Sequence, residues 1–171
     1  CAAHGHHSRV RGVPAAGVTP VTSRTRLRRV SQADHDPALY GSSFADVYDN
    51  WYPPGDTGAL LECIAAFTPP GGRVLELGVG TGRLALPLAE RGLSVTGLEA
   101  SPDMLDRLAA KDPDGRVRAV PGDVARPDGN GAVGCPPWPD GPFDVVLAAG
   151  NLLCNVVDPD AQAAAVAGAA A

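Results

Sequence analysis

The chain has 171 residues, a formal net charge of −5 and 44% hydrophobic residues. This length is that of one domain with its own core, and no apolar run approaches the ~20 residues of a membrane-spanning helix. The charge is uneven: residues 1–36 carry six arginines and two aspartates, whereas residues 37–171 carry eight basic and seventeen acidic side chains. Because an acidic body repels phosphates, nucleic acid is disfavoured as a partner.

Residues 1–36 show no periodicity that predicts a helix or a strand. They combine three early histidines with an arginine-rich stretch, so metal binding, nucleic-acid contact and an organellar transit peptide are open alternatives. Their polar composition is typical of a disordered segment. We therefore predict a disordered basic tail over 1–36 and a folded domain over 37–171.

Two amphipathic helices are predicted before the first strand. The first has an apolar face with helical spacing, made of Phe44, Val47, Tyr48 and Trp51. The second runs to residue 67, with an N-cap at Asp56 and an apolar side made of Leu60, Leu61, Ile64 and Phe67. Packing on the edge of a sheet is one role for these helices. Covering a ligand pocket with Tyr40, Tyr48 or Tyr52 is the other.

Strands and helices then alternate. Apolar runs predict strands over 73–77, 93–98, 116–120 and 143–149, and helical spacing predicts helices over 84–90, 101–111 and from 158 to the chain end. A long Pro/Gly-rich loop covers 124–142. This order predicts an α/β fold with a doubly wound, Rossmann-like parallel sheet and helices on both faces. Ligands of such sheets bind at the carboxyl ends of the strands.

The turn after the first strand contains glycines at 78, 80 and 82, preceded by Glu76. Glycine allows positive φ angles and a close approach of a ligand to the backbone. A dinucleotide fold requires G-x-G-x-x-G, but here Arg83 takes the last glycine's place. A carboxylate at Glu76 repels a pyrophosphate and attracts a sulfonium or ammonium group. An NAD(P)-dependent oxidoreductase is therefore the weaker alternative.

Acidic residues also follow the second and third predicted strands. Glu99 comes 21 positions after Gly78, where a carboxylate accepts hydrogen bonds from both hydroxyls of a ribose. Asp123 lies in the turn after the third strand, where it is placed to accept from an adenine amino group. Because carboxyl ends of parallel strands share one edge of a sheet, we expect both carboxylates near the glycine turn.

These residues resemble class I S-adenosylmethionine-dependent methyltransferases. The resemblance covers residues 40–171 and is carried by the run 76–82, by Glu99, by Asp123-Val124 and by the stretch 149–155. It implies S-adenosyl-L-methionine as the cofactor, with the Gly78–Gly82 backbone around its methionine part. It further implies that Glu99 holds the ribose, that Met104 lines the adenine, and that Asp123 and Val124 meet the adenine edge. Asn151 then lies where methyl donor and acceptor meet.

The chain departs from this family in length. It supplies about four of the seven strands that the family usually has, so we expect a C-terminally truncated methyltransferase whose fourth strand is an exposed apolar edge. The long loop over 124–142 is a second departure. A non-catalytic remnant or a cofactor-binding module therefore stays an alternative to an active enzyme.

The expected function is methyl transfer to a small-molecule acceptor. No catalytic base is predicted, because the four histidines, His4, His6, His7 and His35, all precede the folded region. No metal site is predicted either, since the four cysteines are far apart and form no C-x-x-C pair. The same cysteine pattern suits a reducing compartment, so a cytoplasmic location is expected. The acceptor, the methylated atom and the oligomeric state are not predicted.

Overall fold

The structure is a computed structural model that describes residues 36–53, 57–129 and 137–170. The predicted tail over 1–36 lies, apart from its last residue, outside this part of the chain, and so does the predicted N-cap Asp56. The division of the chain into tail and domain stays a prediction.

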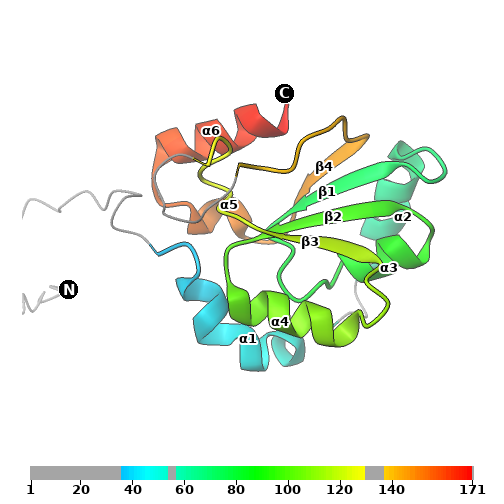
Figure 1. Ribbon diagram of the computed structural model, residues 1–171, viewed down its shortest axis with the longest axis horizontal. Coiled ribbons are helices and arrows are strands. Elements are labelled where there is room, and N and C mark those ends of the chain that lie inside the picture. Colours follow the sequence, from blue (N-terminus) through cyan, green and yellow to red (C-terminus); the bar gives the residue numbers. More distant parts are fainter. Residues whose placement is uncertain (1–35, 54–56, 130–136, 171) are drawn as a thin grey trace, which may run out of the picture.

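A parallel four-stranded sheet forms the centre of the fold (Figure 1). Its strands are β1 (Arg73–Leu77), β2 (Ser94–Glu99), β3 (Val117–Pro121) and β4 (Val145–Ala148), in the order β3-β2-β1-β4. Leu77 lies opposite both Leu98 of β2 and Ala148 of β4, so these strands end level with one another. The predicted Rossmann-like sheet is confirmed. In the described sheet β4 is an edge strand, as expected, although Val145–Leu147 are half-buried rather than exposed.

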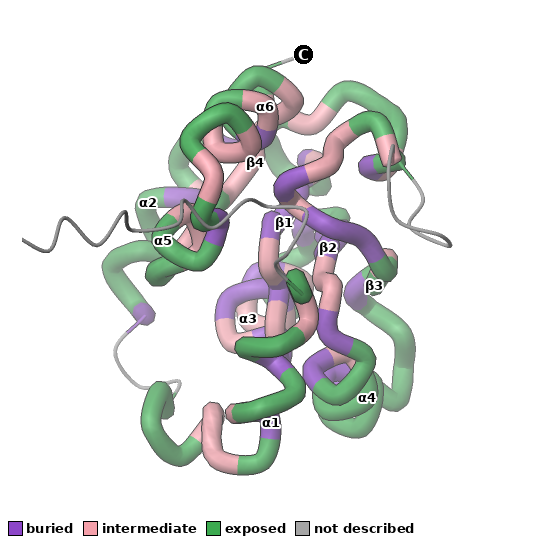
Figure 2. The backbone as a smooth tube through the Cα atoms, turned by 90° about the vertical axis from the view of Figure 1, so that its left-hand side faces the viewer, coloured by how far each residue is buried: buried purple, intermediate pink, exposed green. Residues whose placement is uncertain are grey.

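Helices cover both faces of the sheet (Figures 1 and 2). Their bounds are α1 (Leu39–Trp51), α2 (Gly58–Phe67), α3 (Ala85–Glu90), α4 (Pro102–Lys111), α5 (Leu152–Asn155) and α6 (Pro159–Ala169). The short helix α5 was not predicted, because four residues are too few to show a helical period.

Successive side chains of a strand point to opposite faces of the sheet, and a hydrophobic core forms on each face. Val74, Val95 and Val117 point to one face, where they pack with buried residues of α2, α3 and α4. The buried leucines of β1 and β2 on the other face pack with Trp138 and with Ala165 of α6. These leucines are Leu75, Leu77 and Leu98. Each fully buried aliphatic side chain contributes about 1.5–3 kcal/mol.

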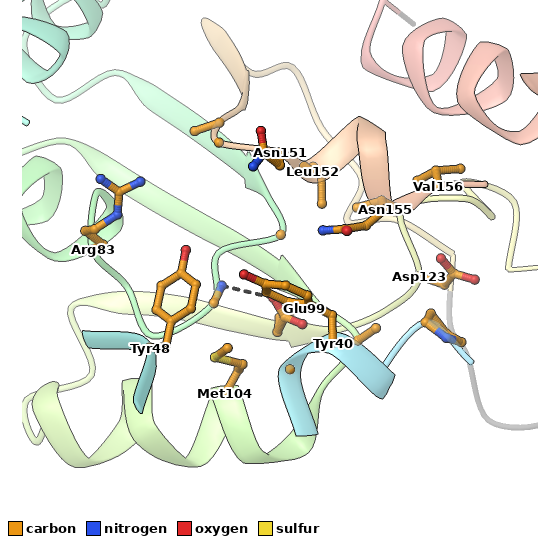
Figure 3. A pocket seen from close by; sticks show the side chains of 18 of the residues that line it. Tyr40, Tyr48, Arg83, Glu99, Met104, Asp123, Asn151, Leu152, Asn155 and Val156 are labelled. Atoms are coloured by element: carbon orange, nitrogen blue, oxygen red, sulfur yellow. Dashed lines mark hydrogen bonds between the residues drawn. The ribbon is translucent and has the colours of Figure 1, made fainter. Parts of the chain in front are cut away.

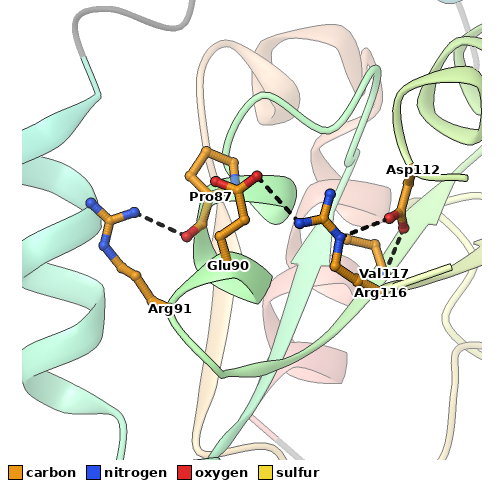
Figure 4. Close-up of polar contacts among 6 residues, drawn as sticks. All are labelled: Pro87, Glu90, Arg91, Asp112, Arg116 and Val117. Carbon is orange, nitrogen blue, oxygen red and sulfur yellow. Dashed lines mark hydrogen bonds and ion pairs between the residues drawn. The ribbon is translucent and has the colours of Figure 1, made fainter. Parts of the chain in front are cut away.

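The amino ends of the strands are fixed by polar contacts (Figure 4). Arg116 pairs with Glu90 at 3.3 Å and with Asp112 at 3.2 Å, and the Val117 N–H donates to the other Asp112 oxygen at 2.8 Å. Gly92, with φ of +85°, closes α3 as predicted. These contacts tie α3 and α4 to β3 at the end of the sheet opposite the carboxyl ends of the strands.

Helices α1 and α2 bury the predicted residues only in part. In α1 the buried residues are Gly41 and Ala45, whereas Trp51 is 58% exposed. Small residues are buried because α1 lies directly on α4: a Cβ added at Gly41 would lie 2.2 Å from the Ser101 Cβ. In α2, Leu61 and Ile64 are buried as predicted, but Leu60 and Phe67 are exposed.

This close approach predicts that Gly41→Ala lowers the free energy of unfolding by about 1–3 kcal/mol, because the added methyl group overpacks the contact. Gly58→Ala is the matched control in α2: its methyl group meets nothing within 4 Å, so a gain of up to about 1 kcal/mol in helix propensity is expected. Urea unfolding followed by circular dichroism measures both. Equal effects of the two substitutions would contradict the packing of α1 on α4.

Candidate cofactor-binding site

A cavity lies at the carboxyl ends of β1, β2 and β3, between α1 and α5 (Figure 3). The structure brings seven of the nine predicted site residues to its wall: Gly78, Gly80, Glu99, Met104, Asp123, Val124 and Asn151. Glu76 and Gly82 do not line it. For all nine residues, a contact with the cofactor stays a prediction.

The three glycines of the turn adopt positive φ angles of 67°, 54° and 83° for different reasons. A Cβ at Gly78 would lie 2.5 Å from Leu152 Cδ1, and one at Gly82 would lie 2.4 Å from Leu108 Cδ1. These two positions therefore require glycine for packing against α5 and α4. A Cβ at Gly80 meets nothing within 4 Å, and Gly80 lines the cavity. Only this position leaves open space for a ligand.

Glu99 joins the glycine turn to the start of α4. Its Oε2 accepts from the Gly80 N–H at 3.0 Å, and its Oε1 accepts from the Ser101 N–H at 2.9 Å. Burial raises the pKa of Glu99, while these two N–H donors oppose the rise. A carboxylate has about four lone-pair sites, so both oxygens retain capacity for the two hydroxyls of a ribose.

Glu76 lies beneath the turn and is 4% exposed. Burial raises the pKa of Glu76 to about 8. The Arg83 charge and the Ala85 N–H lower this pKa, and the nearby Glu99 raises it further. The carboxyl is thus mainly protonated at pH 7, which differs from the anion expected from the sequence. The Ala85 N–H at the start of α3 acts on Glu76. Among the described residues, Glu76 Oε2 is the buried side-chain oxygen without a hydrogen-bond partner.

Asp123 and Met104 both line the cavity, and their predicted contacts with an adenine stay predictions. Met104 is 2% exposed and lines the cavity from α4. The Asp123 carboxylate accepts from the Ala125 N–H at 2.9 Å and pairs with Arg126 at 3.3 Å. Trp138 donates to the Asp123 backbone carbonyl at 3.1 Å, which anchors the loop after β3 beside the cavity.

Helix α1 forms one wall of the cavity, a role that the sequence analysis considered without deciding on it. Tyr40, Tyr48 and Tyr52 all line the cavity, which supports the second of the two roles considered for this helix. Burial raises the pKa of Tyr40, and the adjacent Tyr52 and Tyr48 raise it further, so the three phenols lie close together. Thr81 of the glycine turn donates to Asp49 at 2.5 Å, and Lys111 of α4 pairs with the same carboxylate at 2.9 Å. These bonds fix α1 over the turn.

Helix α5 supplies the opposite wall. Asn151, Leu152 and Asn155 line the cavity, and Figure 3 shows both amides on the side facing α1. Asn155 and Arg83 were not predicted as site residues. Asn155 lies one helical turn after Asn151, but this signal was hidden because α5 itself was not predicted.

No group of three or more possible metal ligands occurs in residues 36–53, 57–129 or 137–170. In the same part of the chain, every helix is too short or too polar to cross a membrane.

The structure is a Rossmann-like fold with a cavity that is lined by a glycine turn and by the Glu99 carboxylate. The sequence matches the family described as "Methyltransferase domain" over residues 74–170, more than half of the chain. The chain belongs to this family. The predicted family, fold class and cofactor, S-adenosylmethionine, are confirmed, and the nicotinamide alternative is not favoured.

Three relatives illustrate the similarity. The cypemycin N-terminal methyltransferase of a Streptomyces species is 38% identical over 92 residues, 52% of this chain and 37% of that protein. The phosphatidylethanolamine N-methyltransferase of Cereibacter sphaeroides is 40% identical over 85 residues, 50% of this chain and 37% of that protein. The CcbJ methyltransferase of Streptomyces caelestis has a solved structure with 37% identity and a TM-score of 0.56, covering 70% of this chain and 47% of that one. The chain thus spans less than half the length of each.

Proposed function

We propose that the chain binds S-adenosylmethionine in the cavity between α1 and α5 and transfers its methyl group to a nitrogen atom of a small molecule or peptide. The observation that carries the proposal is the Glu99 carboxylate, which is hydrogen-bonded to Gly80 and borders the same cavity. It presents two acceptor oxygens for a diol directly beside Gly80, the one of the three glycines in the turn 78–82 whose missing side chain leaves open space.

An amine acceptor suits the groups at this site. The described lining residues include no histidine, lysine or cysteine. Of the two carboxylates there, Glu99 is held by backbone N–H groups and Asp123 by Ala125 and Arg126. A neutral amine needs no base to attack an electrophilic methyl group, so alignment is the main requirement. One relative is an N-methyltransferase by name, and another is named an N-terminal methyltransferase, which supports the same choice.

In the proposed reaction the amine lone pair forms a bond to the methyl carbon. The bond from that carbon to sulfur breaks, and its electron pair stays on sulfur to give S-adenosylhomocysteine. The ammonium product then loses a proton to solvent. The amides of Asn151 and Asn155 carry hydrogen-bond acceptors for an amine N–H, and the α1 tyrosines shield the donor from water.

Calorimetric titration with S-adenosylhomocysteine and with NADH tests the binding step. We expect saturable binding of the first ligand and none of the second, and NADH binding alone would overturn the proposal. The transfer step is tested by measuring S-adenosylhomocysteine production with matched primary amines, phenols and carboxylic acids. Turnover confined to the amines supports a nitrogen acceptor. Binding without turnover of any acceptor would instead identify a cofactor-binding module.

A further inference from the structure

The exposed part of the cavity wall carries no charge. Among the described lining residues, the charged ones are Glu99, Asp123 and Arg83, and all three are buried or half-buried. The exposed lining residues are aromatic, amide or small. They form the mouth of the cavity: Pro37, Tyr40, Tyr52, Gly150, Asn151 and Asn155. A molecule that enters above a bound cofactor therefore meets uncharged groups first.

The α1 side of the mouth is aromatic. Aromatic residues recur at every fourth position of this helix and its cap, at 40, 44, 48 and 52, so their side chains share one face. The ring centroids of Tyr40 and Phe44 are 5.1 Å apart, and those of Tyr48 and Tyr52 are 5.0 Å apart. A hydrogen bond between the side chains of Tyr40 and Tyr52 links the two pairs. The rings thus form one aromatic platform along α1.

This platform does not belong to the hydrophobic core. The buried residues of α1 are Gly41 and Ala45, whereas Tyr40 is 38% exposed and Tyr52 is 42% exposed. Both tyrosines line the cavity. Aromatic surface is therefore left open at the mouth, where a ligand can cover it.

Amides face the platform from α5. Asn151 and Asn155 are exposed and lie on the side of α5 that faces α1 (Figure 3). The Gln162 side chain of α6 donates to the Leu153 and Val156 carbonyls at 3.1 and 2.8 Å, which holds α5 in place. Each asparagine amide offers both hydrogen-bond donors and acceptors. The two walls together suit a flat apolar body that has polar groups on one side.

The same walls disfavour two other kinds of acceptor. A phosphate or carboxylate at the mouth would lose water without gaining a cation there. A quaternary ammonium group binds best where aromatic faces surround it. Here the aromatic side chains come from one face of one helix, with amides opposite, so they offer a platform rather than a cage. An aromatic ring gains most from a platform, because paired rings attract each other beyond their buried area.

We propose that the mouth is an acceptor subsite for an aromatic amine, whose ring packs on Tyr40 and Tyr52. The subsite rests on the proposed function of the cavity, with the cofactor in the deeper part beside Glu99. The ring of the acceptor lies between the tyrosines and the α5 amides, and its amine nitrogen points inward to the methyl donor. The amides of Asn151 and Asn155 bond the amine N–H or a polar substituent of the ring.

The test titrates amines into the chain saturated with S-adenosylhomocysteine and measures their affinities by NMR. Phenethylamine and cyclohexylethylamine have the same charge and a similar size, so they differ mainly in aromaticity. We expect phenethylamine to bind about two- to tenfold more tightly than cyclohexylethylamine, and O-phosphoethanolamine to bind at least about tenfold more weakly than phenethylamine. Equal affinities of the two ring compounds would overturn the subsite, and so would tighter binding of tetramethylammonium than of phenethylamine. If S-adenosylhomocysteine itself does not bind, the proposed function of the cavity fails instead.

Substitutions at the mouth locate the preference for the aromatic ring. Tyr40→Leu combined with Tyr52→Leu should abolish the preference for phenethylamine over cyclohexylethylamine, whereas the two Tyr→Phe changes should keep it because the rings remain. The preference is a ratio of two affinities, so a general weakening of the site cancels. Trp51→Leu is the matched control, since Trp51 is a 58% exposed aromatic residue of α1 that does not line the cavity. A preference that survives in the double leucine variant, or that is lost in Trp51→Leu, would exclude the mouth tyrosines as its source.

Discussion

Gly80→Asp is expected to remove S-adenosylhomocysteine binding, with an affinity loss of at least about 100-fold, or roughly 2.8 kcal/mol. A Cβ at Gly80 meets nothing within 4 Å, so the chain tolerates it, but the open space that it enters belongs to the cavity. The new carboxylate also lies beside Glu99, whose Oε2 accepts from the Gly80 N–H at 3.0 Å. Like charges at such short range destabilise each other. Calorimetry at pH 7 measures the loss.

Gly115→Asp is the matched control for this substitution. Gly115 has a similar φ angle, +64° against +54°, and likewise has nothing within 4 Å of an added Cβ. It lies in the turn before β3, at the amino end of the sheet. Both substitutions place an aspartate in the left-handed region at a cost of roughly 1–2 kcal/mol, but only the one at Gly80 should affect the ligand. Retention of S-adenosylhomocysteine affinity in Gly80→Asp would rule out the proposed cavity.

The glycine turn was predictable because its signals are local. An apolar run, alternate glycines and the following helical spacing lie within a dozen residues, and they specify the strand, the turn and the helix start. Glu99 and Asp123 were predictable for a related reason, since level ends of parallel strands bring residues after successive strands together. In the structure Leu77 and Leu98 are opposite each other, which brings Glu99 to Gly80.

The parts that escaped prediction depend on contacts between distant segments. Nothing near Arg83 in the sequence indicates that Tyr48 and Glu76 surround it, because these residues come from three separate elements. The predicted apolar face of α1 is half-buried except at Trp51, but the fully buried Gly41 and Ala45 were missed. Hydrophobic periodicity favours large residues, whereas a close helix contact selects small ones such as Gly41. The protonation of Glu76 was missed because burial, rather than residue type, decides it.

Glu76 should make the free energy of unfolding of the unliganded chain fall as the pH rises. Its folded pKa is raised from the model-compound value of 4.5 to about 8. A carboxyl with a raised folded pKa binds more protons in the folded than in the unfolded state, so its contribution is fully present below pH 4.5 and is lost as the pH rises through about 8. The shift corresponds to roughly 3–5 kcal/mol lost between pH 5 and pH 9. Burial of the charge is the cause.

Glu76→Gln removes this titration, because a glutamine stays neutral at every pH. We therefore expect the variant and the wild type to have similar free energies of unfolding at pH 5, and the variant to be more stable by roughly 3–5 kcal/mol at pH 9. Urea unfolding across this range, compared with Glu62→Gln on the exposed side of α2, isolates the contribution of Glu76. Asp49, whose pKa is lowered, is present in all three chains and cancels in the difference. Glu99, whose pKa is also raised, is coupled to Glu76, so the difference includes this coupling. Parallel pH profiles for wild type and Glu76→Gln would show that Glu76 is ionised in the folded chain.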